Sequence, residues 1–106
     1  MNVPVIAVNT IKHPETAERF LQEGVSDFVG MSRMQLADPD VVKKAMAAVR
    51  IVIRKCLGCM NCNKSVVAGK NLHCAINPVT GRATVYGDEN LVKTGAGRTV
   101  AVVGGG

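Results

Sequence analysis

The stretch VPVIAVNTIKHPETAERFLQEGVSDFVGM (residues 3–31) decides the fold class of this chain. Residues 3–8 are apolar throughout, which is the pattern of a strand buried on both faces, as in a parallel sheet. Residues 13–24 then favour a helix, because Pro14 suits a first helical position and apolar residues recur at helical spacing. Residues 27–31 predict a second short strand. The stretch therefore predicts one strand–helix–strand unit.

A second helix is predicted directly after this unit. Asp38 and Pro39 are typical of a helix start, with Asp38 as N-cap and Pro39 at the first position, and apolar residues at helical spacing continue to Val49. The order strand, helix, strand, helix with short connections belongs to α/β folds with parallel strands and right-handed crossovers. We therefore predict the α/β class.

The remaining sequence changes character twice. Residues 56–82 are rich in Cys, Gly and Asn without a clear period, and Asn77-Pro78 and Gly81 in this stretch predict turns. Residues 83–98 are polar and predict a connector. Residues 99–103 (TVAVV) predict a third buried strand, which leads into three glycines. Because two strand–helix units do not close a parallel sheet, we expect the chain to be part of a longer polypeptide that begins in one domain and continues in another.

Composition argues against several classes of protein. The chain has 106 residues and a formal charge of +5, but its basic residues are scattered and it has two Phe, one Tyr and no Trp to stack on bases. Nucleic acid is therefore not an expected partner. No apolar run is long enough to span a membrane, and the N-terminus lacks the features of a signal peptide. A cytoplasmic location is expected by default.

Four cysteines carry the clearest chemical signal. Cys56, Cys59 and Cys62 are each separated by two residues, and Cys74 follows after eleven more. Three thiols within seven residues can reach one small object, and a [4Fe–4S] cluster commonly takes three ligands from a tight loop and one from farther along. Zinc sites usually have two separate C-x2-C turns, whereas here both would share Cys59. We predict a [4Fe–4S] cluster, with zinc and then disulfides or free thiols as the alternatives.

Two weaker signals concern phosphate groups. Arg33 follows the second predicted strand and Asn9 and Thr10 follow the first, which is where parallel α/β folds bind ligands. An arginine after a strand is more often simply exposed. Residues 104–106 (GGG) follow a predicted strand and resemble the opening of a G-x-G-x-x-G dinucleotide loop, although a flexible glycine segment is the alternative.

The order of these features resembles the iron–sulfur branch of the old yellow enzyme family, which includes dienoyl-CoA reductase, trimethylamine dehydrogenase and enoate reductase. The matching stretches are PVIAVNTIKHPETAERFLQEGVSDFVGMSRMQLADPD, CLGCMNC, CAINPVTGR and VAVVGGG. The resemblance implies the last two β-α units of a flavin-binding TIM barrel (residues 1–50), then a cluster-binding segment (51–82). A connector (83–98) and the first strand of a Rossmann-like FAD/NAD(P)-binding domain (99–106) would complete the chain.

The resemblance also implies cofactor-binding roles for particular residues. Ser32 and Arg33 would contact the FMN phosphate, with Asn9 and Thr10 beside them. The metal ligands of the cluster would be Cys56, Cys59, Cys62 and Cys74. Gly104 and Gly106 would belong to the FAD-binding loop. No catalytic acid or base is predicted in this chain, because the residues that would bind substrate lie on strands outside it.

The implied function is that of an NAD(P)H-dependent oxidoreductase. Electrons would pass from NAD(P)H through FAD and the cluster to FMN, which would reduce an activated C=C bond of a small-molecule substrate. The chain's expected partner is the remainder of its own polypeptide. The alternative from another class is a small non-catalytic zinc- or iron–sulfur-binding module.

Overall fold

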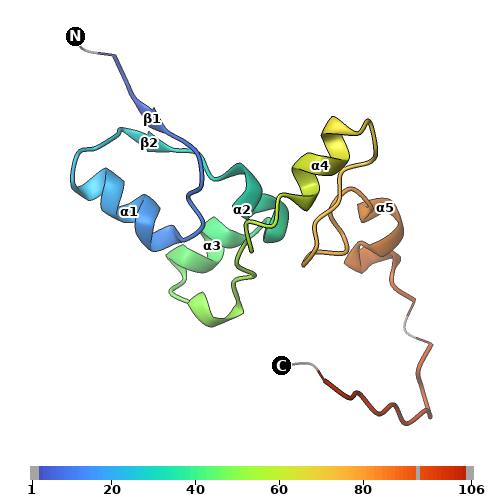
Figure 1. Cartoon of the computed structure of the whole chain (residues 1–106). Helices are drawn as coiled ribbons and strands as arrows, with labels where there is room; N and C mark the ends of the chain where they lie inside the picture. The colour runs from blue at the N-terminus through green and yellow to red at the C-terminus, as the bar shows by residue number, and fades with distance from the viewer. Residues whose placement is uncertain (1–2, 93, 105–106) are drawn as a thin grey trace.

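The computed structural model describes residues 3–92 and 94–104. The N-terminal half contains a two-stranded sheet and three helices, and the C-terminal half contains two short helices joined by loops (Figure 1). The elements in chain order are β1 (Ile6–Ala7), α1 (Pro14–Gln22), β2 (Phe28–Val29), α2 (Ser32–Ala37), α3 (Val41–Met46), the 3-10 turn η1 (Arg50–Val52), α4 (Asn61–Val67), α5 (Ala83–Tyr86) and the 3-10 turn η2 (Asp88–Asn90).

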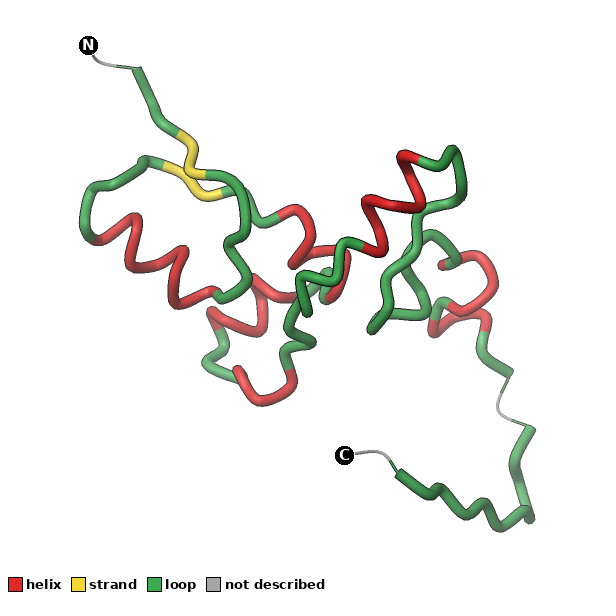
Figure 2. Tube along the Cα trace, viewed as in Figure 1, coloured by secondary structure: helices red, strands yellow, loops and turns green. Residues whose placement is uncertain are grey.

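The two strands are parallel, as predicted. Ile6 pairs with Phe28 and Ala7 with Val29, and α1 connects them. The ladder is shorter than the predicted residues 3–8 and 27–31, because each strand has one hydrogen-bonded neighbour among the described residues (Figure 2). This arrangement places the chain in the α/β class, while the assignment to a TIM barrel stays a prediction.

The helix starts differ from the prediction at Asp38. Asp38 ends α2, which was not predicted, and α3 begins at Val41 with Asp40 as its N-cap. The carboxylate of Asp38 accepts the backbone N–H of Asp40 at 3.2 Å and that of Arg54 at 3.0 Å. Asp38 therefore joins two segments instead of starting the helix, because Arg54, sixteen residues away, offers it a donor that sequence spacing does not show.

The C-terminal third also departs from the prediction. The segment predicted as irregular contains α4, and the predicted connector contains α5 and η2. Residues 99–103 run as extended chain that pairs with no strand among the described residues, and Val103 is fully exposed (Figure 1). They are not a buried strand here, because a strand needs a hydrogen-bonded neighbour to bury its backbone.

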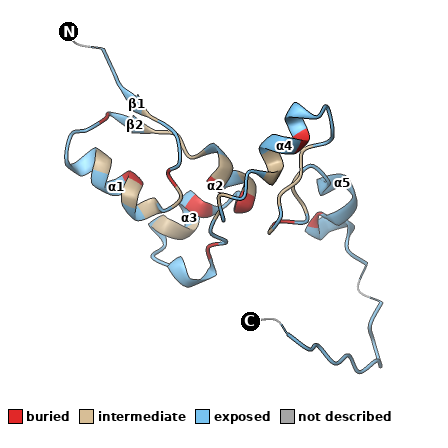
Figure 3. Cartoon of the chain, in the orientation of Figure 1, coloured by how far each residue is buried: buried red, intermediate tan, exposed pale blue. Residues whose placement is uncertain are grey.

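The small core lies where α2 and α3 meet the chain that leads to the cysteines. Met34, Val41 and Ile53 form it, with Met31 and Cys56 packed against it. Buried residues are few elsewhere (Figure 3). The core therefore anchors the first cysteine to the helices that follow β2.

No helix in the described parts of the chain has the length and apolar character that crossing a bilayer requires.

Candidate functional site

The loop that carries the first three cysteines is shaped by two residues with left-handed backbone. Gly58 has φ +71° and Met60 has φ +60°. Glycine adopts this conformation freely, whereas a residue with a side chain does so at a cost of about 1–2 kcal/mol. The two reversals bend the loop tightly, and α4 begins directly after Met60 with Cys62 in its first turn. Three cysteines are thereby held on one compact bend.

The fourth cysteine is brought back by contacts with α4. The hydroxyl of Ser65, which is buried, donates a hydrogen bond of 2.9 Å to the backbone oxygen of Asn61 and, with its one proton so used, accepts one of 2.9 Å from Nδ1 of His73. His73 therefore holds the returning chain, which places the adjacent Cys74 opposite the loop.

A second set of hydrogen bonds fixes the returning chain to α2. The buried Asn77 donates from Nδ2 to the backbone oxygen of Leu36 at 2.9 Å, and Thr80 Oγ1 donates to the same oxygen at 2.7 Å. Arg54 Nη1 donates to Oδ1 of Asn77 at 3.1 Å. The chain after Cys74 is therefore tied to α2, and Arg54, just before Cys56, is tied to that chain.

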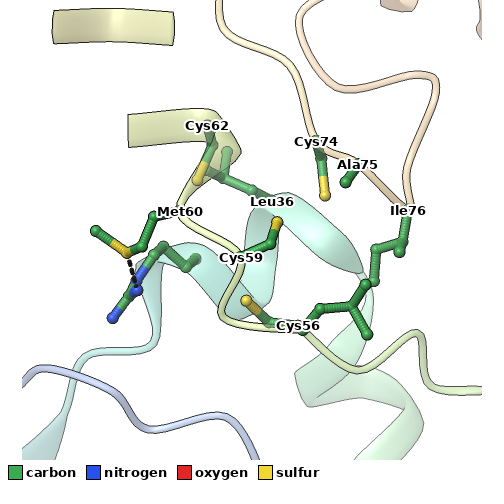
Figure 4. Close-up of a pocket in the computed structure, with 10 residues that line it drawn as sticks. Leu36, Cys56, Cys59, Met60, Cys62, Cys74, Ala75 and Ile76 are labelled. Atoms are coloured by element: carbon green, nitrogen blue, oxygen red, sulfur yellow. Dashed lines mark hydrogen bonds between the residues drawn. The ribbon is translucent and has the colours of Figure 1, made fainter. Parts of the chain in front are cut away.

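All four predicted ligands surround one pocket. Figure 4 shows the sulfur atoms of Cys56, Cys59, Cys62 and Cys74 directed toward a common space. All four thiols are free. Apolar side chains complete the wall, namely Leu36, Leu57, Met60, Ala75 and Ile76. The structure therefore brings together every cysteine that the sequence spacing singled out.

The four thiols could in principle bind either a single zinc ion or an iron–sulfur cluster. A single zinc ion with four Zn–S bonds of about 2.3 Å needs sulfur atoms roughly 4 Å apart. Among the described residues, no three His, Cys, Asp or Glu side chains are gathered closely enough to hold one metal ion. A cubane of four irons takes one thiolate at each corner and so accepts ligands that stand farther apart. Four thiols around an apolar-walled space thus fit an iron–sulfur cluster in their chemistry.

A second pocket of about 90 Å³ lies at the carboxyl ends of the two strands. Asn9, Thr10, Ser32 and Arg33 all line it, so the four residues predicted to bind phosphate lie together. Arg33 Nη2 donates to Thr10 Oγ1 at 3.4 Å, and Thr10 Oγ1 donates to Asn9 Oδ1 at 2.9 Å. Asn9 and Thr10 have φ of +81° and +54°, which curves the loop after β1 around this anion pocket.

Arg33 and Cys56 line both pockets. Nη1 of Arg33 also contacts the sulfur of Met60 at 2.6 Å, across the boundary between α2 and the cysteine loop. The anion pocket and the four-cysteine pocket are therefore direct neighbours.

Gly104, one of the two glycines predicted for the FAD loop, is not part of either pocket. Gly104 is exposed, with φ +85°, and lines neither of them. Gly106 lies outside the described residues. Their predicted role is not tested by this arrangement.

Sequence reasoning missed three residues that shape the site. Asp38 appeared as a helix start and Asn77 as a turn residue, yet each makes long-range hydrogen bonds. Lys12, which lines the anion pocket, appeared only as one of many scattered basic residues. Its place in the short segment that follows a predicted strand was the available signal.

The relatives that a comparison with known proteins finds include several named oxidoreductases. No protein-family model matches it. It is 40% identical to an NADH oxidase from Thermoanaerobacter brockii, 38% identical to a metal reductase from Desulforamulus reducens and 30% identical to a cinnamate reductase from Clostridium sporogenes. Each match takes in 100% of this chain, which spans 16% of the relative's length.

A solved structure shows the same arrangement of the chain. It is the 6-hydroxypseudooxynicotine amine oxidase from Pseudomonas geniculata N1, with a TM-score of 0.76 and 31% sequence identity. The match covers 82% of this chain and 13% of the amine oxidase. The fold described above therefore also occurs as one segment of a much larger oxidoreductase.

Proposed function

We propose a function for the complete protein from its relatives. Over its whole length this chain is homologous to one segment of the oxidoreductase family that includes the NADH oxidase and the cinnamate reductase. It is an NAD(P)H-dependent flavin oxidoreductase, and the segment described here holds a [4Fe–4S] cluster beside the phosphate of FMN. The substrate is a small molecule with an activated C=C bond.

One observation carries this proposal. The four cysteines surround a single pocket, and that pocket shares Arg33 and Cys56 with the anion pocket at the carboxyl ends of β1 and β2. Adjacent binding sites for a cluster and a flavin suit electron transfer, because transfer over a short path needs no moving carrier. Either site alone would fit many other functions.

Each group of residues has a distinct task in this proposal. The thiolates of Cys56, Cys59, Cys62 and Cys74 bind the four irons, while Leu57 and Met60 limit the access of water. The guanidinium of Arg33 binds the FMN phosphate by charge-assisted hydrogen bonds, with Thr10 beside it. Gly104 and Gly106 are proposed for the FAD-binding loop. A bound cluster supplies one-electron transfer between FAD and FMN.

Metal and sulfide analysis tests the proposal. The complete protein, purified or reconstituted without oxygen, should contain about four irons and four sulfides per chain, as a cubane requires. Flavin analysis should find both FMN and FAD. One zinc per chain with no iron uptake would instead support the small zinc-binding module.

A further inference from the structure

Lys12 reaches from the loop after β1 to the cysteine loop. A methyl group placed on the α-carbon of Gly58 would lie 2.5 Å from Nζ of Lys12 and 2.9 Å from its Cε. The end of the lysine side chain therefore rests directly against Gly58. Because Gly58 has φ +71° and no side chain, it provides both the bend and the space that the ammonium group takes up.

The glycine that this ammonium group contacts is hydrogen-bonded to one proposed ligand of the cluster. The N–H of Gly58 donates to Sγ of Cys56 at 3.4 Å, so the residue that Lys12 touches is itself bonded to a proposed ligand. Lys12 and Cys56 line the same pocket, together with Arg33. None of the ion pairs formed among the described residues involves Lys12.

Other basic residues near the cysteines have different contacts. The guanidinium of Arg33 contacts the sulfur of Met60 and Oγ1 of Thr10. The guanidinium of Arg54 is hydrogen-bonded to Asn77, away from the pocket between the sulfurs. Lys12 comes from a different part of the chain, forty-four residues before Cys56, and it is half-buried. A partly buried charge is screened less by salt than one in open solvent.

We propose that Lys12 is a positioning residue that brings a positive charge to the Gly58 turn and thereby raises the reduction potential of the cluster. The inference rests on the proposed function, since it needs the cluster to be present. Reduction adds an electron to a centre whose thiolate and sulfide ligands are negative. A nearby ammonium group stabilises the reduced form more than the oxidised form, and net charge is one of the factors that set such potentials.

The test uses the complete protein and a redox titration of the cluster followed by electron paramagnetic resonance. Lys12→Met keeps an unbranched side chain only one heavy atom shorter and removes its charge, so the potential should become more negative while the iron content stays at the wild-type value. Lys12→Arg keeps the charge and should restore a potential close to that of the wild type. Lys43→Met is the matched control, because Lys43 lies on α3, lines neither pocket and pairs with Asp40 on the surface.

The outcomes separate this inference from the proposed function. A Lys12→Met variant with full iron content and an unchanged or more positive potential would overturn the role of Lys12 alone. Loss of iron in both Lys12 variants would overturn it too, since a preserved charge should preserve the site. If Lys12→Met loses iron while Lys12→Arg keeps it, the result supports the proposal that the cluster needs a positive charge beside the Gly58 turn. A wild-type protein without iron would refute the proposed function itself, and the inference with it.

Discussion

Asp38 links the end of α2 to the segment that leads to the cysteines. Its side chain is 1% exposed and receives the Lys44 ammonium at 2.6 Å as well as two backbone amides. Burial alone would raise the pKa of this carboxyl group, but the hydrogen bonds from Lys44, Arg54 and Asp40, with the charge of Lys44, outweigh it and hold the pKa below the usual 3.8. The folded state therefore favours the carboxylate.

A depressed pKa makes a prediction about stability and pH. The contribution of Asp38 is present above its unfolded-state pKa, near 3.8, and is lost as the pH falls through the lower folded-state pKa. Asp38→Asn should lower the free energy of unfolding at pH 7 by about 1–3 kcal/mol, because it leaves buried donors with a weaker acceptor. The difference from wild type should shrink below about pH 4.

Urea denaturation followed by circular dichroism at pH 7 and pH 3 measures both effects. Asp40→Asn is the control. Among the described residues the side chain of Asp40 forms an exposed pair with Lys43 and no capping hydrogen bond, so its change should affect stability little. An equal loss of stability in both variants at pH 7 would contradict the special role of Asp38.

Arg33 yields the second prediction at the scale of a residue. In the complete protein, Arg33→Ala should weaken FMN binding by at least about tenfold, because charge-assisted hydrogen bonds of about 1.5–3 kcal/mol are lost. Fluorescence titration of the apoprotein with FMN measures this. Arg19→Ala on α1 is the control, because Arg19 stacks over Phe20 and lines neither pocket of the site. Unchanged FMN affinity would remove Arg33 from the binding site.

At the scale of elements, the sequence predicted correctly those features that depend on residues close together in the chain. The strand–helix–strand unit follows from an apolar run, a proline at the start of α1 and a second apolar run, and the structure confirms its order and its parallel pairing. The four cysteines gather because three of them are close in sequence. The predicted start of α3 was wrong because the carboxylate of Asp38 accepts the N–H of Arg54 instead of capping the helix. A contact between residues so far apart in the chain cannot be read from the local sequence.

The turn before α5 shows another contact that sequence pattern conceals. Gly81 has φ +72°, and a methyl group at this glycine would collide with the backbone oxygen of Leu72. The loop segments around Leu72 and Gly81, one on each side of Cys74 in the sequence, therefore pass each other with their backbones in direct contact. Sequence identified Gly81 as a turn residue, but not as the point of this crossing.

This crossing predicts the effect of a single methyl group. Gly81→Ala should destabilise the protein by more than about 1 kcal/mol, because it adds both left-handed strain and a clash with fixed backbone. It should also lower iron content, since Leu72 lies two residues before Cys74. Gly95→Ala is the control, as nothing lies within 4 Å of a methyl group at that glycine. Thermal unfolding and iron analysis of the two variants check this, and equal behaviour would contradict it.

At the scale of the whole molecule, the chain is far more open than its length requires. Its radius of gyration is 17.4 Å, whereas a compact domain of this length has about 13 Å. Its accessible surface is 8356 Å², against roughly 5,700 Å² for a compact chain of this mass. Apolar side chains on the two strands and next to them stay exposed, including Ile6 on β1, Phe28 on β2 and Val5 just before β1. Such surfaces are normally covered by further protein.

Openness of this degree predicts weak cooperativity for the 106-residue chain on its own. With so small a core, it should unfold over a broad temperature range and bind the dye ANS, because exposed apolar surface attracts the dye. Circular dichroism and ANS fluorescence measure the two properties. A sharp, cooperative transition without dye binding would show that the chain forms an independent domain.

In the order of the chain, the four cysteines lie between the two proposed flavin sites, and this gives the last prediction, which concerns the complete enzyme. Replacing Cys59 by Ser removes one of four ligands and should disturb the cluster. NAD(P)H should still reduce FAD, since that step needs only the domain that binds both. Artificial electron donors should still drive FMN to reduce substrate. Turnover from NAD(P)H to substrate should nevertheless fall by orders of magnitude, because the one-electron path between the flavins is lost.

The variant must first be shown to keep its fold and both flavins, because loss of a cluster can unfold the segment that binds it. Ser65→Ala is a useful comparison, since Ser65 positions the returning chain through His73 without being a proposed ligand. It should lower the cluster content only in part, and turnover should fall in proportion to the iron that is lost. A folded Cys59→Ser protein with both flavins, no cluster and near-normal turnover would mean that the four cysteines serve the structure and not electron transfer.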